Sequence, residues 1–155
     1  MSTSDQYGEP APERGGAYTY TGPIRWEYSP ELDRDPDPGE IVWTWVAFEE
    51  NAHAGKDRPV AVVGRADDGR LAALMLSSKE HDGDRDWISI GTGPWDREGR
   101  ESWVRRDRVL AVHADAVRRE GAVLPRTTYD AIVAGMGGHA RQGILGRLRR
   151  MLNRK

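Results

Sequence analysis

Gly55-Lys56-Asp57-Arg58-Pro59-Val60-Ala61-Val62-Val63 places a charged segment directly before a run of β-branched and small apolar residues. Because proline restricts its own backbone and disfavours helix in the residue before it, Pro59 predicts the entry to a strand that follows a loop. Arg58 then lies at the mouth of that strand, where a planar, permanently charged guanidinium can grip phosphate through two parallel hydrogen bonds. A surface arginine paired with Asp57 or Glu50 is the simpler interpretation on spacing alone.

Short runs of β-forming residues continue on both sides of this strand. Asp67-Asp68-Gly69-Arg70 is a typical hairpin turn between two of them. We expect strands over residues 40–48, 59–64, 71–76, 87–90, 102–106 and 109–113. Because these strands are short and almost regularly spaced, they predict a small β-barrel or sandwich.

The pattern becomes helical after the last of these strands. Residues 114–119 predict a short helix that ends near Gly121. A second helix is expected to begin at Thr127 or Thr128, either of which can cap it, with Tyr129 on its apolar face. Together these elements predict a mainly β fold with added helix, of the α+β type.

The two ends of the chain differ sharply in charge. Residues 1–38 carry eight acids and three arginines, a net −5, and hold six of the nine prolines. We therefore expect an acidic, proline-rich and largely disordered extension over residues 1–37, with the aromatic piece 18–28 as a candidate for packing against the body. Residues 141–155 carry six bases and no acid, a net +6, around an apolar stripe. They predict a basic amphipathic helical tail over residues 139–155.

A basic tail of this kind suits contact with a polyanion such as RNA, or with a membrane surface. The acidic extension would compete for the same basic surface. Solvated ends that only keep the protein dissolved are equally compatible with this charge pattern.

Composition argues against several classes of protein. Without cysteine the chain has neither a disulfide scaffold nor a thiolate metal site, and its four scattered histidines contain no close pair for zinc. No apolar run approaches the roughly 20 residues that span a bilayer. The N-terminus lacks the basic and apolar regions of a signal peptide. We expect a cytoplasmic protein that uses no metal or other cofactor.

Two types of reactive side chain follow the apolar run 71–76. Ser77 and Ser78 come first, where a hydroxyl can donate to an oxyanion, although alternation along a strand allows only one of them on a given side. His81 comes next, and histidine is the side chain best suited to move protons near neutral pH. Ordinary loop hydrogen bonding and a solvated loop histidine are the competing interpretations.

Residues 91–96, Gly-Thr-Gly-Pro-Trp-Asp, form a glycine-rich loop without the Gly-Lys-Ser/Thr signature of a phosphate loop. Trp95 either stacks on an unpaired base or anchors its own loop. The acids between residues 80 and 86 lack the regular calcium-loop pattern, so calcium is not favoured. The strand tryptophans are expected in the core or at a dimer interface: Trp43, Trp45, Trp87 and Trp103.

Five elements occur in a defined order along the chain: Pro38-Gly39-Glu40-Ile41-Val42-Trp43, Gly55-Lys56-Asp57-Arg58-Pro59-Val60, Leu74-Met75-Leu76-Ser77-Ser78, Ser102-Trp103-Val104-Arg105-Arg106-Asp107-Arg108-Val109 and Ala131-Ile132-Val133. In this order they resemble the PemK/MazF family of toxins from bacterial type II toxin–antitoxin systems. Each element is weak alone, but the ordered set across residues 38–135 is specific. The loops 79–82 and 91–95 resemble an actinobacterial subgroup.

The resemblance implies a small SH3-like barrel of the MazF/PemK/CcdB type with a C-terminal helix, spanning residues 38–136 and forming a homodimer. It implies metal-independent cleavage of single-stranded RNA and a cognate antitoxin as partner. By position, Arg58 matches the family's catalytic arginine and Ser77 its catalytic threonine or serine. We add His81 as a candidate proton carrier. The candidate RNA contacts are Lys56, Ser78, Lys79 and Trp95.

Two other functions stay open at this stage. The related CcdB barrel poisons gyrase, so the fold does not determine the function. The main alternative is a non-catalytic barrel that binds RNA or a protein partner, for example a gyrase- or ribosome-directed inhibitor. The other is an interaction protein with a decayed site.

Overall fold

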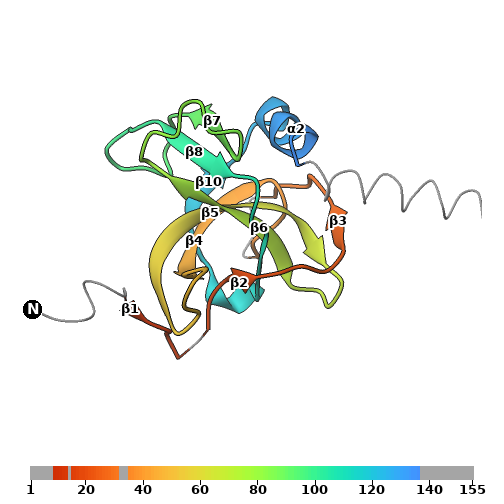
Figure 1. Ribbon diagram of the computed structural model, residues 1–155. Helices are drawn as coiled ribbons and strands as arrows, with labels where there is room; N and C mark the ends of the chain where they lie inside the picture. Colours follow the sequence, from red (N-terminus) through yellow and green to blue (C-terminus); the bar gives the residue numbers. More distant parts are fainter. Residues whose placement is uncertain (1–8, 14, 32–34, 137–155) are drawn as a thin grey trace, which may run out of the picture.

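The computed structural model describes residues 9–13, 15–31 and 35–136. Within them, antiparallel β-sheet dominates and one α-helix follows (Figure 1). The elements in chain order are β1 (Glu9–Pro10), β2 (Tyr18–Thr19), β3 (Ile24–Trp26), β4 (Glu40–Ala47), β5 (Ala54–Ala66), β6 (Leu71–Ser77), β7 (Trp87–Gly91), β8 (Ser102–Arg105), β9 (Leu110–Val112), the 3-10 turn η1 (Ala114–Ala116), β10 (Arg118–Val123) and α2 (Arg126–Ala134). No helix in these ranges is long and apolar enough to cross a membrane. The expected basic helix of residues 139–155 lies outside the described residues.

Five strands close into a small barrel. β4 pairs with β5, β5 with β6, β6 with β9 and β9 with β2, all antiparallel. Ala17, just before β2, completes the ring by bridging to Val46 of β4. Its N–H donates to the Trp45 carbonyl at 2.8 Å and its carbonyl accepts from the Ala47 N–H at 2.9 Å. The small barrel expected from the sequence is thus confirmed, and closure joins β2 to β4 instead of leaving these two edges open.

Small and branched apolar side chains fill the barrel interior. Successive side chains of a strand point to opposite faces, so the even-numbered residues of β4 and β5 and the odd-numbered residues of β6 face inward. Burial of these side chains is the main source of barrel stability. The interior consists of Ala17, Val42, Val46, Val60, Val62, Leu71, Ala73, Met75, Leu110 and Val112.

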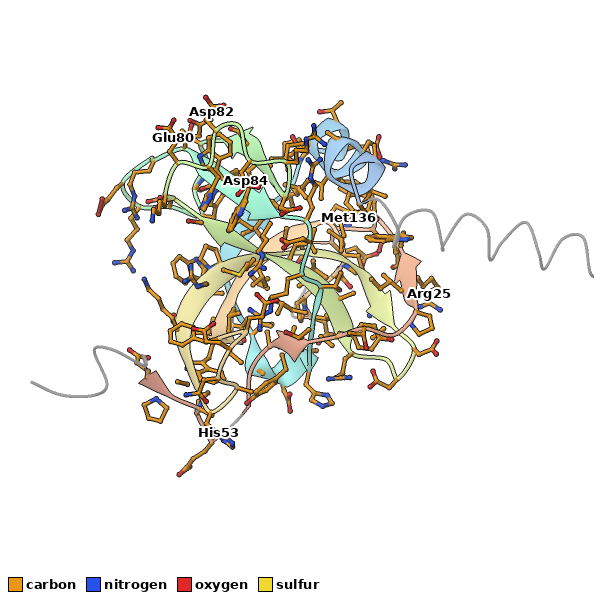
Figure 2. All side chains as sticks on the ribbon, viewed as in Figure 1. Arg25, His53, Glu80, Asp82, Asp84 and Met136 are labelled. Carbon is orange, nitrogen blue, oxygen red and sulfur yellow. The ribbon has the colours of Figure 1, made fainter. Side chains whose placement is uncertain are left out.

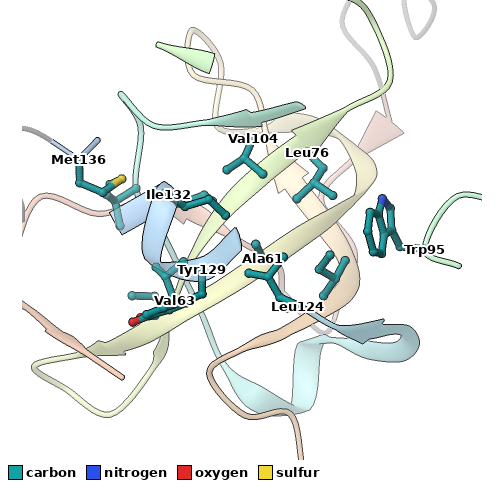
Figure 3. Packing of buried hydrophobic residues seen from close by; sticks show 13 residues of the cluster. Ala61, Val63, Leu76, Trp95, Val104, Leu124, Tyr129, Ile132 and Met136 are labelled. Atoms are coloured by element: carbon teal, nitrogen blue, oxygen red, sulfur yellow. The ribbon is translucent and has the colours of Figure 1, made fainter. Parts of the chain in front are cut away.

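A second apolar cluster covers the opposite face of the sheet, and α2 lies on it (Figure 3). The helix buries Tyr129 and Ile132 there, as its apolar face predicts. The Tyr129 hydroxyl donates to the Val63 carbonyl at 2.8 Å, and the Tyr28 hydroxyl donates to the Leu124 carbonyl at 2.6 Å. These bonds satisfy a buried hydroxyl and a half-buried one, and they hold α2 and its entry against the sheet.

Strand β5 begins earlier than the sequence predicts. Its first residue is Ala54 rather than Pro59, so Lys56 and Arg58 lie on the strand and not in a loop. Proline lacks an N–H, yet it is tolerated at this place because the ladder with β6 begins only at Val60. The missing donor therefore breaks no bond between β5 and β6.

The expected helix over residues 114–119 is wrong. Only Ala114–Ala116 is helical, as a single 3-10 turn, and from Arg118 the chain continues as β10, which pairs with β4. Pairing with a neighbouring strand outweighs a weak local helix preference. Helix α2 also begins before both threonine candidates, with Pro125 in the capping position.

The described part of the N-terminal extension is more ordered than its composition predicts. β1 and β3 pair with β5, and β2 pairs with β9 (Figure 1). Trp26 and Tyr28 pack against the outer apolar cluster, so the aromatic piece 18–28 does join the body. Gly64 makes room for β3, since a Cβ at this position would lie 2.2 Å from the Arg25 carbonyl oxygen. Pairing with β5 and β9 supplies hydrogen-bond partners for the backbone of this segment, which its local composition does not predict.

Tyr129 should make stability depend on alkaline pH. Burial raises the pKa of its phenol to about 12, since the phenolate would lose its hydration. The folded-state pKa exceeds the unfolded value, so this stabilisation is complete below about pH 10 and is lost as pH rises through about 12. We expect Tyr129→Phe to remove the last step from the tyrosinate absorbance titration and to flatten the alkaline loss of stability. Tyr20→Phe, at an exposed hydroxyl, should keep that step; an unchanged last step in Tyr129→Phe would contradict the assignment.

Candidate functional site

A cleft of about 670 Å³ lies where β5 and β6 part at one mouth of the barrel. The ladder between the two strands ends at the Val60–Met75 pair. Beyond this pair, β5 continues beside β4, whereas β6 turns to pair with β8 at Leu76 and Ser77. Residues 94–98 and the start of β10 line the cleft as well. Diverging strands thus create a hollow that is walled by secondary structure.

The strand register brings Arg58 and Ser77 into this cleft together. Each lies two residues beyond a member of the Val60–Met75 pair, toward the mouth. Side chains two residues apart share a face of a strand, so both continue the face that forms the barrel interior. Both line the cleft.

Arg58 is a half-buried cation with no opposite charge bound to it. Among the residues that the structure describes, no hydrogen bond or ion pair reaches its guanidinium, and burial lowers its pKa because desolvation opposes the charged form. The group nevertheless stays charged at neutral pH. Neighbouring Asp57 is engaged elsewhere, since its two carboxylate oxygens accept from Arg118 at 2.5 and 3.1 Å. An uncompensated buried charge of this kind favours a bound anion.

The cleft as a whole has a positive balance. Asp57 pairs with Arg118, and Asp96 pairs with Arg100. The lining contains six cationic and three acidic side chains, a net charge of +3. Because positive charge predominates in a cleft with low-dielectric walls, the electrostatic potential there attracts an incoming anion. The cations are Lys56, Arg58, Lys79, Arg97, Arg100 and Arg118, and the acids are Asp57, Asp96 and Glu98.

Ser77 presents a hydroxyl in a defined position. Its Oγ accepts the backbone N–H of Lys79 at 3.1 Å, which closes a turn at the end of β6. This bond uses an oxygen lone pair and leaves the hydroxyl proton free to be donated. Ser78 and Lys79 are more exposed than Ser77, and all three line the cleft.

Trp95 belongs to the outer core more than to the cleft surface. Its side chain is only 6% exposed, it packs in the cluster beneath α2, and its indole N–H donates to the Ser102 hydroxyl at 2.8 Å (Figure 3). Gly93 accommodates the ring, since a Cβ there would lie 2.1 Å from it. The structure therefore favours the loop-anchoring role of Trp95 and leaves its ring little surface for stacking on a base.

His81 is the one candidate residue that the structure leaves outside the cleft lining. Its ring stacks on Trp87 with centroids 3.7 Å apart and planes 4° apart, and its edge meets Trp103 at 6.3 Å. The acids of the same loop extend into solvent, as Figure 2 shows for Glu80 and Asp82. Across the described ranges, no group of three or more histidines and acids is arranged to hold a metal ion.

Several residues that line the cleft were not among the sequence candidates, and those with a cationic or aromatic side chain are Trp43, Arg97, Arg100 and Arg118. Arg118 was hidden because its segment resembles a helix, whereas it lies on β10 directly opposite Trp43. Trp43 was expected in the core or at a dimer interface, and in the structure it is half-buried and lines the cleft. No local signal distinguishes a core tryptophan from one at the end of a strand, because register alone separates them.

The fold and cleft define a small β-barrel protein with an anion-attracting mouth. A family model described as a PemK-like, MazF-like toxin of type II toxin-antitoxin system matches residues 37–137. The chain belongs to this toxin family. Comparison with curated proteins gave no match. Strands β1 to β3 precede the matched region, so the segment that closes the barrel lies outside it.

Proposed function

We propose that this toxin is an endoribonuclease that cleaves single-stranded RNA. The observation that carries the proposal is Arg58, a half-buried guanidinium without a counter-ion that shares a cationic cleft with the Ser77 hydroxyl. An RNA backbone supplies one phosphate per nucleotide, which is the anion such a site lacks. The family to which the chain belongs supports the same activity.

The proposed reaction uses the RNA's own nucleophile. The 2′-hydroxyl oxygen attacks the adjacent phosphorus, the bond from phosphorus to the 5′ oxygen breaks, and the products are a 2′,3′-cyclic phosphate and a 5′-hydroxyl. One proton leaves the 2′-hydroxyl and one reaches the departing 5′ oxygen. Arg58 offsets the charge that develops on the phosphorane, and the Ser77 hydroxyl donates a hydrogen bond to one of the phosphoryl oxygens while keeping its proton. The remaining cleft cations position the flanking phosphates, among them Lys56 and Lys79.

The toxin class also implies partners. We propose a cognate antitoxin that covers the cationic cleft with an acidic segment, since the net positive lining attracts such a segment as it attracts RNA. A homodimer and a cytoplasmic site of action, where mRNA is available, belong to the same proposal.

The proposal is tested by inducing the protein in bacterial cells and mapping RNA 5′ ends, together with cleavage of a defined single-stranded RNA by the purified protein. We expect growth arrest with new ends that carry a 5′-hydroxyl, and no cleavage where the attacking 2′-hydroxyl is replaced by hydrogen. Cleavage that persists at a 2′-deoxy position would exclude this mechanism. Growth arrest without new RNA ends would favour a non-catalytic binding function.

His81→Gln should leave RNA cleavage within about threefold of wild type, because this side chain stacks on Trp87 and does not line the cleft. The measurement is single-turnover cleavage across a range of pH, with Gln chosen to keep the size and polarity of the ring. A loss of about 100-fold, together with the disappearance of one limb of the pH profile, would restore His81 as the proton carrier.

A further inference from the structure

The cleft contains an aromatic side chain that the cleavage step does not use. Trp43 is half-buried and lines the cleft. Within the described part of the chain no aromatic ring packs on it at stacking distance, and its indole N–H has no hydrogen-bond partner. Trp95 differs on both counts, since it is buried and its N–H is bound by Ser102. Of the two tryptophans that the structure describes at the cleft, only Trp43 is partly exposed and has an unbonded indole N–H.

The cross-strand neighbours of Trp43 are a proline and a cation. On the sheet Trp43 lies directly opposite Pro59 of β5 on one side and Arg118 of β10 on the other. Directly opposite residues share a face, with Cβ atoms about 5 Å apart. Arg118 is in turn held by its two bonds to Asp57. A flat apolar surface therefore lies between a rigid proline and an anchored cation.

We propose that Trp43 forms a nucleobase subsite, on which an unpaired base of the RNA stacks while Arg58 holds a backbone phosphate. This inference rests on the proposed RNA function and extends it to the bases. Arg58 lies opposite Thr44, the residue after Trp43, so the side chains of Arg58 and Trp43 leave opposite faces of the β4–β5 ladder, and both line the cleft at the mouth of the barrel. Every base has a face that can stack on an aromatic ring, and a cation at its side strengthens the contact. The free indole N–H provides a donor toward a base or sugar oxygen.

The test compares Trp43→Leu, which keeps apolar volume but loses the aromatic face, with Trp43→Phe, which keeps that face. The probes are two fluorescein-labelled oligomers of about twelve nucleotides. One is a 2′-fluoro RNA of mixed sequence, which cannot be cleaved because it lacks the 2′-hydroxyl. The other is a backbone of the same length without bases. Binding is measured by fluorescence anisotropy at low salt. Trp26→Phe, outside this cleft, is the matched control.

We expect Trp43→Leu to bind the base-bearing oligomer about tenfold more weakly and Trp43→Phe to stay within about threefold of wild type. All variants should bind the abasic oligomer equally, because phosphate contacts are intact. Equal loss on both oligomers, or no loss on either, overturns the base subsite and leaves the proposed RNA function standing. If wild type binds neither oligomer and cleaves no RNA, the proposed function fails together with the inference.

Discussion

Arg58→Ala is expected to reduce RNA cleavage by at least about 10²- to 10³-fold, which is the usual effect of removing one preorganised donor from a developing oxyanion. Arg58 is half-buried beside Ser77, and no described residue neutralises its charge, so nothing else in the cleft occupies its position. Growth arrest on induction should disappear with cleavage. Arg58→Lys should restore only part of the activity, because an ammonium keeps the charge but not the two parallel hydrogen bonds.

The same substitution should leave the fold at least as stable as wild type. Burial lowers the pKa of Arg58, which means that the folded protein penalises this charge, and removing it relieves that penalty. Thermal unfolding of Arg58→Ala should therefore occur at an equal or higher temperature. Arg25→Ala, at an exposed position on β3, is the matched control for both assays (Figure 2). Full cleavage by a folded Arg58→Ala protein would refute the site.

Ala17→Asp is expected to destabilise the protein by about 3 kcal/mol or more, a large part of the total stability of a typical domain. Ala17 is fully buried, and its backbone makes the two bonds that close the barrel onto β4. A carboxylate at this position would enter the apolar cluster that fills the barrel interior. Urea unfolding followed by tryptophan fluorescence measures the loss as a lower midpoint.

The control for this experiment is Thr21→Asp, which adds the same charge a few residues later at an exposed position. It should change stability by less than about 0.5 kcal/mol. Comparable stability of Ala17→Asp and wild type would mean that residues before β4 do not close the barrel. The pair of variants thus separates a structural N-terminal segment from a dispensable extension.

Much of the candidate site followed from short stretches of sequence. The apolar run 71–76 and the hairpin at Gly69 predict Ser77 at the end of the strand that follows the one at whose entry Arg58 lies, and in the structure both residues line the cleft. Trp95 and His81 do not lie where their residue types alone suggest. Their residue types suit base stacking and proton transfer, but one lies in the outer core and the other on Trp87. The residue type determines which chemistry a side chain can perform, whereas its position in the fold depends on contacts with residues far away in the sequence.

By itself the sequence determined most of the strand and turn pattern of the body, the presence of helix α2 and the family, because hydrophobic period and turn chemistry act within a few residues. Only the tertiary structure decided that Ala17 closes the barrel, that Arg118 lies on a strand, and that Trp43 rather than Trp95 is partly exposed at the cleft. Those outcomes depend on which distant strands pair and in which register, and a shift of one residue exchanges the buried and exposed faces of a strand.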